Sequence, residues 1–349
     1  MKIAITSYYL PSGSKIGVGY MVHYLANELV RRGHAVTVFS ACAECSDSLY
    51  HVQQVPCGNN LRTFRFAWAL RQYDFTQFDV LNAHGDDWFL WGCKLPRHVH
   101  TYHGSCFAEM LNATTVPVRA RMAALALCEF TAAFLADKCV AVSENTKRYI
   151  PRIDCIVPNG VDLSTFTPTE QKSEQPSILF VGTMHGRKRG ALLLDLFRRE
   201  IRPNLPTAQL WAVCETPVHG DGVHWCGRIP LEHLVTLYQH AWVFCLPSTY
   251  EGFGVPYIEA MASGTPVVAT PNPGAKEITR NGKFGVLAGD RKLGSALLHL
   301  LRDENARTEL RNAGLLRAKD FAWEAVCQSY ENLYLDRLHS TPLPEPLAL

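Results

Sequence analysis

Short apolar strands alternate with helical patterns along the chain, and this alternation occurs twice. One helical pattern, over residues 18–32, ends at Gly33-His34, which is a typical helix stop. Repeated strand–helix units predict parallel sheets covered by helices on both faces. The predicted strands are 2–7, 35–40, 80–84, 98–102, 138–142 and 155–157 in the first half, and 178–181, 208–213, 242–246 and 266–269 in the second half.

The length of the chain indicates more than one hydrophobic core. A chain of 349 residues exceeds an ordinary single core, and 47% apolar with 19% charged residues is typical of a folded globular protein. We expect a first α/β domain over 1–160, a linker over 161–176 and a second α/β domain over 177–320. A C-terminal helix over 321–339 would pack back on the first domain, and a Pro-rich tail over 340–349 would be disordered.

The charge and hydropathy of the chain exclude several classes of partner. A net charge of +2 without a long basic run argues against a nucleic-acid partner. The N-terminus reads as a buried strand, and no apolar run reaches the ~18 to 20 residues of a membrane span. We expect a cytoplasmic protein with at most weak peripheral contact at the inner membrane face. Basic residues suggest where contact would occur: Arg62, Arg65 and Arg71 alternate with aromatic residues, and Arg119 and Arg121 precede an apolar helix over 122–135, for which burial against a sheet is the favoured interpretation.

The twelve cysteines do not form a regular metal-binding pattern. Most of them lie in apolar stretches, where free cysteine behaves as a small hydrophobic residue. Cys42 and Cys45 form a single C-x-x-C, for which His51 and Cys57 are irregular partners. Structural zinc sites favour paired, regular spacing. We therefore predict reduced thiols and no metal.

The segment 247–268 carries the clearest functional signal. An apolar strand leads into a Gly-rich loop, and the loop leads into a helix with Pro256 in its first turn, where a missing N–H has no cost. A helix N-terminus after a tight turn binds anions through backbone N–H groups and the helix dipole. Glu251 on the loop and Glu259 in the helix add hydroxyl acceptors. The ligand predicted from this combination is a sugar nucleotide.

This segment resembles the Glu-x7-Glu signature of the retaining glycosyltransferases of family 4. Residues 157–162 resemble the family's passage between domains, and 178–183 followed by Arg187-Lys188 resemble its second-domain phosphate loop. Residues 101–104 and 140–144 match first-domain landmarks in the family's order. The resemblance implies a GT-B fold, with two Rossmann-like doubly wound parallel sheets that face a central cleft. It also implies sugar transfer with retention, from a UDP- or GDP-sugar to a hydroxyl of a saccharide, glycolipid or secondary-metabolite precursor, without a metal or another cofactor.

The same resemblance assigns roles to individual residues. Arg187 and Lys188 would stabilise charge on the departing diphosphate, because catalysis requires cations where negative charge develops. Glu251 would lie near the sugar, Glu259 would accept the ribose hydroxyls, and His103 would reach the donor sugar from the first domain. The remaining donor contacts are expected from Gly17, Gly19, Gly182, Arg228, Gly252, Phe253, Gly254 and Val255.

Two further motifs allow more than one interpretation. Gly17-Val18-Gly19 before a helix lacks the third glycine of a dinucleotide fingerprint, because position 22 is Val, so a glycine loop beside the diphosphate fits better. Asp86, Asp87 and Trp88 follow a predicted strand. They could bind the acceptor, with Trp88 stacked on a sugar ring, or an aspartate could cap a helix.

Two other functions use the same kind of ligand. A nucleotide-sugar binding protein without catalysis would keep the fold and lose turnover. A GT-B phosphorylase or epimerase would act on the donor without this type of acceptor. No Asp-x-Asp occurs in the sequence, which argues against the metal-dependent glycosyltransferase fold.

Overall fold

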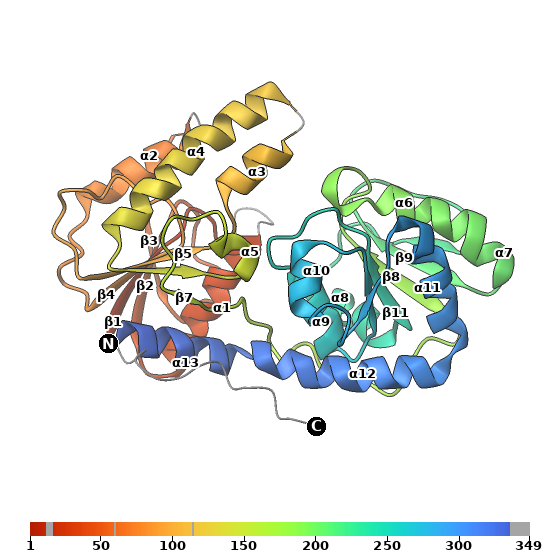
Figure 1. Cartoon of the computed structure of the whole chain (residues 1–349). Helices are drawn as coiled ribbons and strands as arrows, with labels where there is room; N and C mark the ends of the chain where they lie inside the picture. Colours follow the sequence, from red (N-terminus) through yellow and green to blue (C-terminus); the bar gives the residue numbers. More distant parts are fainter. Residues whose placement is uncertain (12–16, 59–60, 114, 336–349) are drawn as a thin grey trace. The chain divides into compact units, whose positions relative to one another are not determined.

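A computed structural model describes residues 1–11, 17–58, 61–113 and 115–335 (Figure 1). The chain divides into two compact units. Of the described residues, the N-terminal unit comprises those of Met1–Gly160 and those from Trp323 to Leu335, and the C-terminal unit comprises Val161–Ala322. The tail predicted over 340–349, and residues 336–339 of the predicted C-terminal helix, lie outside the described residues.

The N-terminal unit is built on a seven-stranded parallel sheet in the order β3-β2-β1-β4-β5-β6-β7. The order reverses between β1 and β4, so that loops after these two neighbouring strands diverge and leave a crevice at their carboxyl ends. The strands are β1 (Lys2–Thr6), β2 (Ala35–Ser40), β3 (His51–Gln54), β4 (Val80–Ala83), β5 (Arg97–Tyr102), β6 (Lys138–Ala141) and β7 (Cys155–Ile156).

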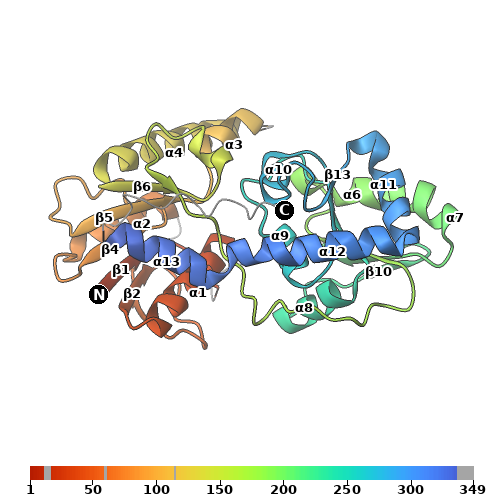
Figure 2. The ribbon, with the colours of Figure 1, turned by 60° about the horizontal axis from the view of Figure 1, so that its bottom comes forward.

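Helices cover both faces of this sheet, and the side chains of β4 contact helices on each face in turn. Leu81 packs into a core with Phe66, whereas the neighbouring Asn82 donates a buried hydrogen bond to Tyr334 at 2.7 Å. Successive side chains of a strand point to opposite faces. Figures 1 and 2 show α13 beside α1, while α2 and α4 lie together. The helices are α1 (Gly17–Arg31), α2 (Arg62–Ala69) followed by the 3-10 turn η1 (Leu70–Gln72), α3 (Cys106–Asn112), α4 (Val116–Leu135), α5 (Glu144–Lys147) and α13 (Trp323–Tyr334).

The C-terminal unit contains a six-stranded parallel sheet in the order β10-β9-β8-β11-β12-β13, which reverses between β8 and β11. Its strands are β8 (Ser177–Val181), β9 (Gln209–Val213), β10 (Val223–Trp225), β11 (Val243–Leu246), β12 (Val267–Ala269) and β13 (Val286–Leu287). Its helical segments are η2 (Gly186–Lys188), α6 (Gly190–Leu196), the π-helical η3 (Phe197–Ile201), α7 (Arg202–Asn204), α8 (Leu231–His240), α9 (Val255–Ala262), α10 (Pro273–Ile278), α11 (Asp290–Arg302), α12 (Glu304–Ala318) and η4 (Lys319–Phe321).

The sequence predicted two parallel-sheet α/β domains, and this prediction is confirmed. Every predicted strand is present within one or two residues of its expected bounds, whereas β3, β10 and β13 were missed. β3 has the sequence His-Val-Gln-Gln at the edge of its sheet, so it lacks the apolar run of a central strand. β10 lies at an edge too, and β13 contains only two residues.

Two other segments differ from the expectation. Residues 161–176 belong to the C-terminal unit, where the Lys172 ammonium donates to the carbonyl oxygens of Gln239 and Gly264 at 2.7 and 3.1 Å. Helix α4 begins at Val116, before the expected 122, and the prediction that it is buried is only half right. Leu127 and Phe134 on its outer side are 67% and 76% exposed. No helix within the described residues combines the length and apolar character needed to cross a membrane.

Candidate active site

In the C-terminal unit, the predicted donor residues gather where the strand order reverses. Gly182 and the η2 turn with Arg187 and Lys188 follow β8, and Glu251 lies on the loop that follows β11. β8 and β11 are neighbours in the sheet, so their carboxyl ends place these loops side by side. Ligands of open α/β sheets bind at this position.

Arg187 and Glu251 form an ion pair across the two loops. The Arg187 Nη1 donates to Glu251 Oε2 at 2.6 Å and to the Tyr250 carbonyl oxygen at 2.9 Å. The other carboxylate oxygen of Glu251 accepts from the Ser248 hydroxyl at 2.7 Å. The Glu251 side chain is buried, whereas that of Arg187 is 53% exposed. The carboxylate is thus fixed on both oxygens, while the guanidinium remains accessible to a ligand.

Lys188 packs beside this pair because Gly182 leaves room for it. A Cβ at position 182 would lie only 2.7 Å from the Lys188 Cδ. Burial lowers the pKa of the Lys188 ammonium, and the nearby carboxylates of Glu251 and Glu259 act in the opposite direction. The ammonium is therefore a partly desolvated cation between two carboxylates. Such a group favours an additional anionic ligand that supplies the missing solvation.

Glu259 lies in α9, one turn beyond Val255 at the helix start. Its Oε2 accepts a hydrogen bond from the Tyr238 hydroxyl at 3.1 Å. Burial raises the pKa of the Glu259 carboxyl to about 7, against opposing effects of Tyr238 and Lys188. A carboxyl with this pKa changes its charge near neutral pH, which is a frequent property of functional groups.

The loop before α9 is shaped by close packing. Gly254 has a φ of 103°, a backbone conformation that residues with a side chain rarely adopt. Phe253 is buried against Phe321, with the ring centroids 5.7 Å apart. Gly252 lies between Glu251 and this packed phenylalanine. Arg228 follows the edge strand β10 of the same sheet, is exposed, and forms an ion pair with Glu215. The expected contact of Arg228 with the donor stays a prediction.

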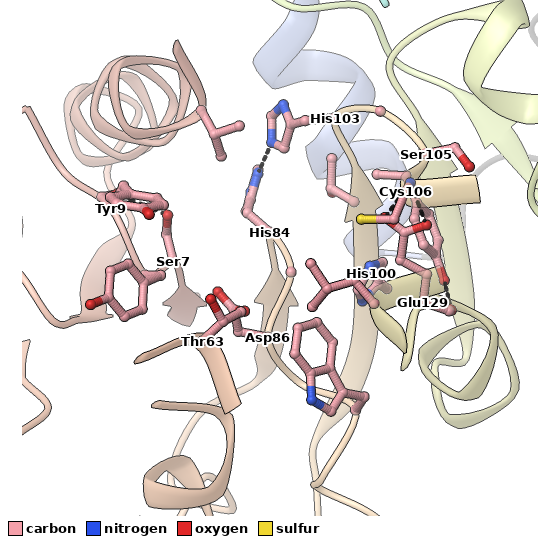
Figure 3. A pocket seen from close by; sticks show the side chains of 18 of the residues that line it. Ser7, Tyr9, Thr63, His84, Asp86, His100, His103, Ser105, Cys106 and Glu129 are labelled. Atoms are coloured by element: carbon pink, nitrogen blue, oxygen red, sulfur yellow. Dashed lines mark hydrogen bonds between the residues drawn. The ribbon is translucent and has the colours of Figure 1, made fainter. Parts of the chain in front are cut away.

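The N-terminal unit holds a cavity of about 360 Å³ at its own reversal point, between the carboxyl ends of β1 and β4 (Figure 3). This volume lies in the range of small-molecule sites. One part of the wall is apolar and aromatic, with Val18, Trp88, Met122 and Leu125. The polar part includes Ser7, Thr63, His84, Asp86, His100, His103, Cys106, Glu109 and Glu129.

His103 pairs with a second histidine in this cavity. Its Nε2 lies 2.7 Å from His84 Nδ1, and the two rings are stacked with centroids 5.0 Å apart. One ring nitrogen donates and the other accepts, so at least one imidazole is neutral. Burial lowers the pKa of His103 to about 4 and that of His84 well below its usual range. At neutral pH both rings are therefore uncharged.

Asp86, Asp87 and Trp88 have three different environments. Asp86 lines the cavity with a φ of 67°, and Trp88 lines it with its indole Nε1 buried and unpartnered within the described structure. Asp87 is fully buried and contacts His98 Nε2 and His100 Nδ1 at 2.8 Å each. These two imidazoles hold the pKa of the Asp87 carboxyl far below its usual range, against the effect of burial. Turns follow Asp87, and no helix begins there, so the helix-cap interpretation is wrong.

Comparison with known proteins identifies the family. The model for Glycosyltransferase Family 4 matches residues 16–165, and the model for Glycosyl transferases group 1 matches residues 175–303. The chain belongs to glycosyltransferase family 4. It is 29% identical to O-antigen chain mannosyltransferase B from Escherichia coli over 77% of each chain.

A second relative and a solved structure show further similarity. The chain is 25% identical to D-inositol 3-phosphate glycosyltransferase from Corynebacterium diphtheriae, over 93% of this chain and 91% of the relative. The structure of HepE from Anabaena, solved with UDP-glucose, superposes with a TM-score of 0.77 at 16% identity, over 97% of this chain and 100% of HepE. The GT-B fold predicted from the sequence is confirmed.

Sequence reasoning missed several residues of the N-terminal cavity of this family 4 member. Both carboxylate oxygens of Glu129 accept from the Cys106 backbone N–H, at 2.9 and 3.1 Å, and His84, His100 and Glu109 line the same space. The available signal was weak. Glu129 is the single charged residue within the apolar stretch 122–135. A charged residue in a buried segment usually has a polar partner, so its presence there indicates a specific contact.

Gly17 and Gly19 lie at the start of α1 in the N-terminal unit. A Cβ at Gly19 would approach the backbone of Tyr9 and Leu10 at 3.1 Å, so this glycine lets the helix start lie against the loop after β1. Val18, between the two glycines, lines the cavity. Their expected contact with the donor stays a prediction.

The cysteine-rich segment forms one cluster of metal-ligand type within the described residues. His23, Cys45 and Asp47 place ligand atoms within 4.8 Å of one another, whereas Cys42, His51 and Cys57 are not part of the group. His23 already bonds Tyr50 and Asn27, at 2.8 and 3.2 Å. These hydrogen bonds are those of a satisfied buried histidine, and the absence of a metal site stays a prediction.

Proposed function

We propose that this family 4 member transfers a sugar from a nucleotide-diphosphate sugar to a hydroxyl acceptor, with retention at the anomeric carbon and without a metal ion. The observation that carries the proposal is the Arg187–Glu251 pair at 2.6 Å, with Lys188 beside it, at the carboxyl ends of β8 and β11. Two cations and two carboxylates at one sheet edge suit a ligand with both phosphates and hydroxyls.

The cations would act on the leaving group. Cleavage of the bond between the anomeric carbon and the diphosphate leaves negative charge on the phosphate oxygens, and preorganised cations stabilise that charge. Arg187 can bind a phosphate through its exposed guanidinium face, and Lys188 can do so as a point charge. Together they make a metal ion unnecessary in the proposed reaction.

The carboxylates would bind the sugar and the nucleoside. Glu259 in its ionised form can accept both ribose hydroxyls. Glu251 would contact the transferred sugar. Its two oxygens are already held by Arg187 and Ser248, which makes Glu251 poorly suited to attack carbon as a nucleophile. This restraint favours a same-face reaction over a covalent glycosyl intermediate.

In the same-face reaction, the departing diphosphate acts as the base. The bond from the anomeric carbon to the phosphate oxygen breaks while the acceptor oxygen bonds to that carbon on the same face. The acceptor proton passes to the leaving phosphate oxygen, so no protein base is required. The cavity of the N-terminal unit would hold the acceptor, and His103 on its wall, neutral at pH 7, would contact the donor sugar.

A thermal-shift screen with UDP-, GDP-, ADP- and dTDP-sugars tests donor binding, since a ligand that binds the native state raises the unfolding temperature. We expect the sugars of one nucleotide to raise the unfolding temperature more than the sugars of the other three. An acceptor screen with that donor, followed by NMR, should then show a product with the donor's anomeric configuration, formed equally well in excess EDTA. Inversion, or a strict divalent-metal requirement, contradicts the mechanism. Donor binding without turnover would favour a silent binding protein, and turnover only with inorganic phosphate would favour a phosphorylase.

A further inference from the structure

The cavity of the N-terminal unit has an uneven distribution of charge. Three carboxyl groups line it: Asp86 after β4, Glu109 in α3 and Glu129 in α4. Within the described lining there is no lysine or arginine. Basic side chains act on two tyrosines of the lining: Arg62 on Tyr8 and Arg152 on Tyr102. Figure 3 shows Asp86 with Thr63 on one side, Cys106 with Glu129 on the other, and His100 between them.

Two of these carboxyls have no cationic partner. Asp86 accepts a hydrogen bond from the Tyr8 backbone N–H, and Glu129 accepts from Cys106. Burial, together with the neighbouring Asp87, raises the pKa of Asp86 to about 8, and burial raises that of Glu129 to about 7. The neighbouring Asp87 differs from these two carboxyls because it has two histidine partners, His98 and His100. They lower its pKa, and it remains ionised.

An uncompensated pair of carboxyls in a cavity is costly for the protein alone. A buried carboxylate requires a counter-charge or hydrogen-bond donors, and otherwise it takes up a proton. A cationic ligand supplies both the charge and the donors. The cavity also offers an apolar wall with Trp88, against which the C–H face of a sugar or cyclitol ring can pack, and hydroxyl partners at Ser7 and Thr63.

We propose that the acceptor is a polyhydroxylated ring that carries a protonated amine, held between Asp86 and Glu129, and not a phosphorylated ring. The inference rests on the proposed function, since it names the substrate class of the acceptor cavity. A phosphate in this cavity would meet three carboxyls and no described cation. In this respect the chain would differ from its relative named D-inositol 3-phosphate glycosyltransferase.

The test compares closely related hexoses that carry a positive, neutral or negative substituent. Glucosamine, 6-amino-6-deoxyglucose, glucose and glucose 6-phosphate are titrated into the full-length protein near pH 7, and the methyl NMR signals of Met122 and Leu125 report on cavity binding. We expect the tighter amino sugar to bind at least about tenfold more tightly than glucose, which is about 1.4 kcal/mol, and glucose 6-phosphate to bind least. Equal affinities for amino sugar and glucose, preference for the phosphate, or no saturable shift with either amino sugar overturns the inference.

Variants locate the effect. Asp86→Asn, which suits the positive φ at this position, and Glu129→Gln should each bring the ratio of amino-sugar to glucose affinity toward one. Glu44→Gln, an exposed carboxylate of the same unit outside the cavity, should leave the ratio unchanged. An undiminished preference in both cavity variants overturns the inference.

Proton linkage gives a second measurement. Binding of an ammonium should release protons near pH 7, because carboxyls that are protonated in the empty cavity ionise against the cation. Calorimetry in two buffers of different ionisation enthalpy measures this release, and proton uptake contradicts the inference. The other titratable or charged groups around the two carboxyls include Tyr8, His84, Asp87, His100, Tyr102, His103, Cys106, Glu109 and Cys128, with Arg62 acting on Tyr8 and Arg152 on Tyr102.

Failure of this inference can be separated from failure of the proposed function. Nucleotide binding is followed by thermal shift with the nucleotide sugars alone. A protein that consumes a donor but shows no preference for the amine overturns only the acceptor class. A protein that prefers amino sugars but neither binds nor consumes any nucleotide sugar overturns the transferase proposal.

Discussion

Arg187 and Glu251, from loops after two neighbouring strands, are hydrogen-bonded at 2.6 Å. The cation proposed to act on the diphosphate is thus positioned by the carboxylate proposed to contact the sugar. Removal of either side chain leaves the other without its partner in a partly buried site. Effects on binding and on turnover should therefore not add when both residues are replaced.

Lys188→Ala and Glu251→Gln should each lower kcat by about two orders of magnitude or more, as is typical when transition-state electrostatics are lost. Both variants should keep the unfolding temperature close to that of the wild type. Lys292→Ala, which removes an exposed lysine of the same unit, is the matched control and should retain full turnover. Unchanged kinetics in purified Lys188→Ala or Glu251→Gln removes the proposed role of that residue.

Glu259→Gln should stabilise the protein at alkaline pH and weaken the donor complex. The pKa of Glu259 is raised from 4.5 to about 7 in the fold, so its ionisation opposes folding as pH rises through this window. The shift corresponds to about 3 kcal/mol as an upper bound. Unfolding free energies of variant and wild type should agree below about pH 4.5 and diverge in favour of the variant above pH 7.

Calorimetry separates the two effects of this substitution. Glu259→Ala and Glu259→Gln should bind the nucleotide more weakly and raise the KM for the donor, because the ribose hydroxyls lose a carboxylate acceptor. Glu232→Gln, an exposed carboxylate in α8, should change neither stability nor affinity. A nucleotide affinity in both Glu259 variants equal to that of the wild type refutes the ribose assignment.

The residues predicted to bind the donor are brought together by the fold, whereas the N-terminal cavity proposed to hold the acceptor was only partly foreseen, for a physical reason. Lys188 and Glu251 each follow a recognisable strand, and strand order places such loops together at a sheet edge. The cavity of the N-terminal unit combines Asp86 with Glu129, which lie in a loop and in a distant helix. No local sequence pattern indicates that Asp86 and Glu129 line the same cavity, because this depends on how α4 packs against the sheet.

The same distinction explains the errors in single elements. The central strand β11 is apolar throughout and β4 is apolar except for Asn82, whereas the edge strand β3 has a single apolar residue, Val52, and was overlooked. Asp87 was weighed as an acceptor ligand or a helix cap. It is neither a lining residue nor a cap, since its carboxylate is taken up by His98 and His100 from the adjacent strand β5.

The His84–His103 pair should make the protein sensitive to acid. Both pKa values are lowered in the fold, that of His103 to about 4, while an unfolded histidine takes up a proton near 6.5. The unfolded chain therefore binds more protons between these values, and stability present above pH 6.5 is lost as pH falls toward 4. Calorimetric unfolding of His103→Gln should show a shallower loss over this range than the wild type. His219→Gln, at an exposed histidine, should follow the wild type, and identical slopes in all three proteins contradict the buried neutral pair.

The last prediction concerns anionic lipid. Leu127 and Phe134 are exposed on α4, and Trp68 and Trp91 are exposed as well, with the Arg71 guanidinium 5.3 and 5.2 Å from their ring centroids. Arg71 also donates to the Trp91 carbonyl oxygen at 2.9 Å, so its charge is engaged locally. We therefore expect only weak contact with lipid, carried by Arg62 and Arg65 and by the apolar side of α4.

Flotation with liposomes checks this expectation. The protein should remain in the dense fraction with neutral vesicles and co-float only in part with vesicles rich in anionic lipid at low salt, because exposed charges are screened within about 10 Å at 0.1 M salt. Replacement of Arg62 and Arg65 by glutamine should abolish this co-flotation, and Leu127→Ser with Phe134→Ser should weaken it. Lys292→Ala, in the other unit, serves as the control. Complete co-flotation that resists high salt would instead require deep insertion of the α4 side chains, and it would favour a lipid-carried acceptor.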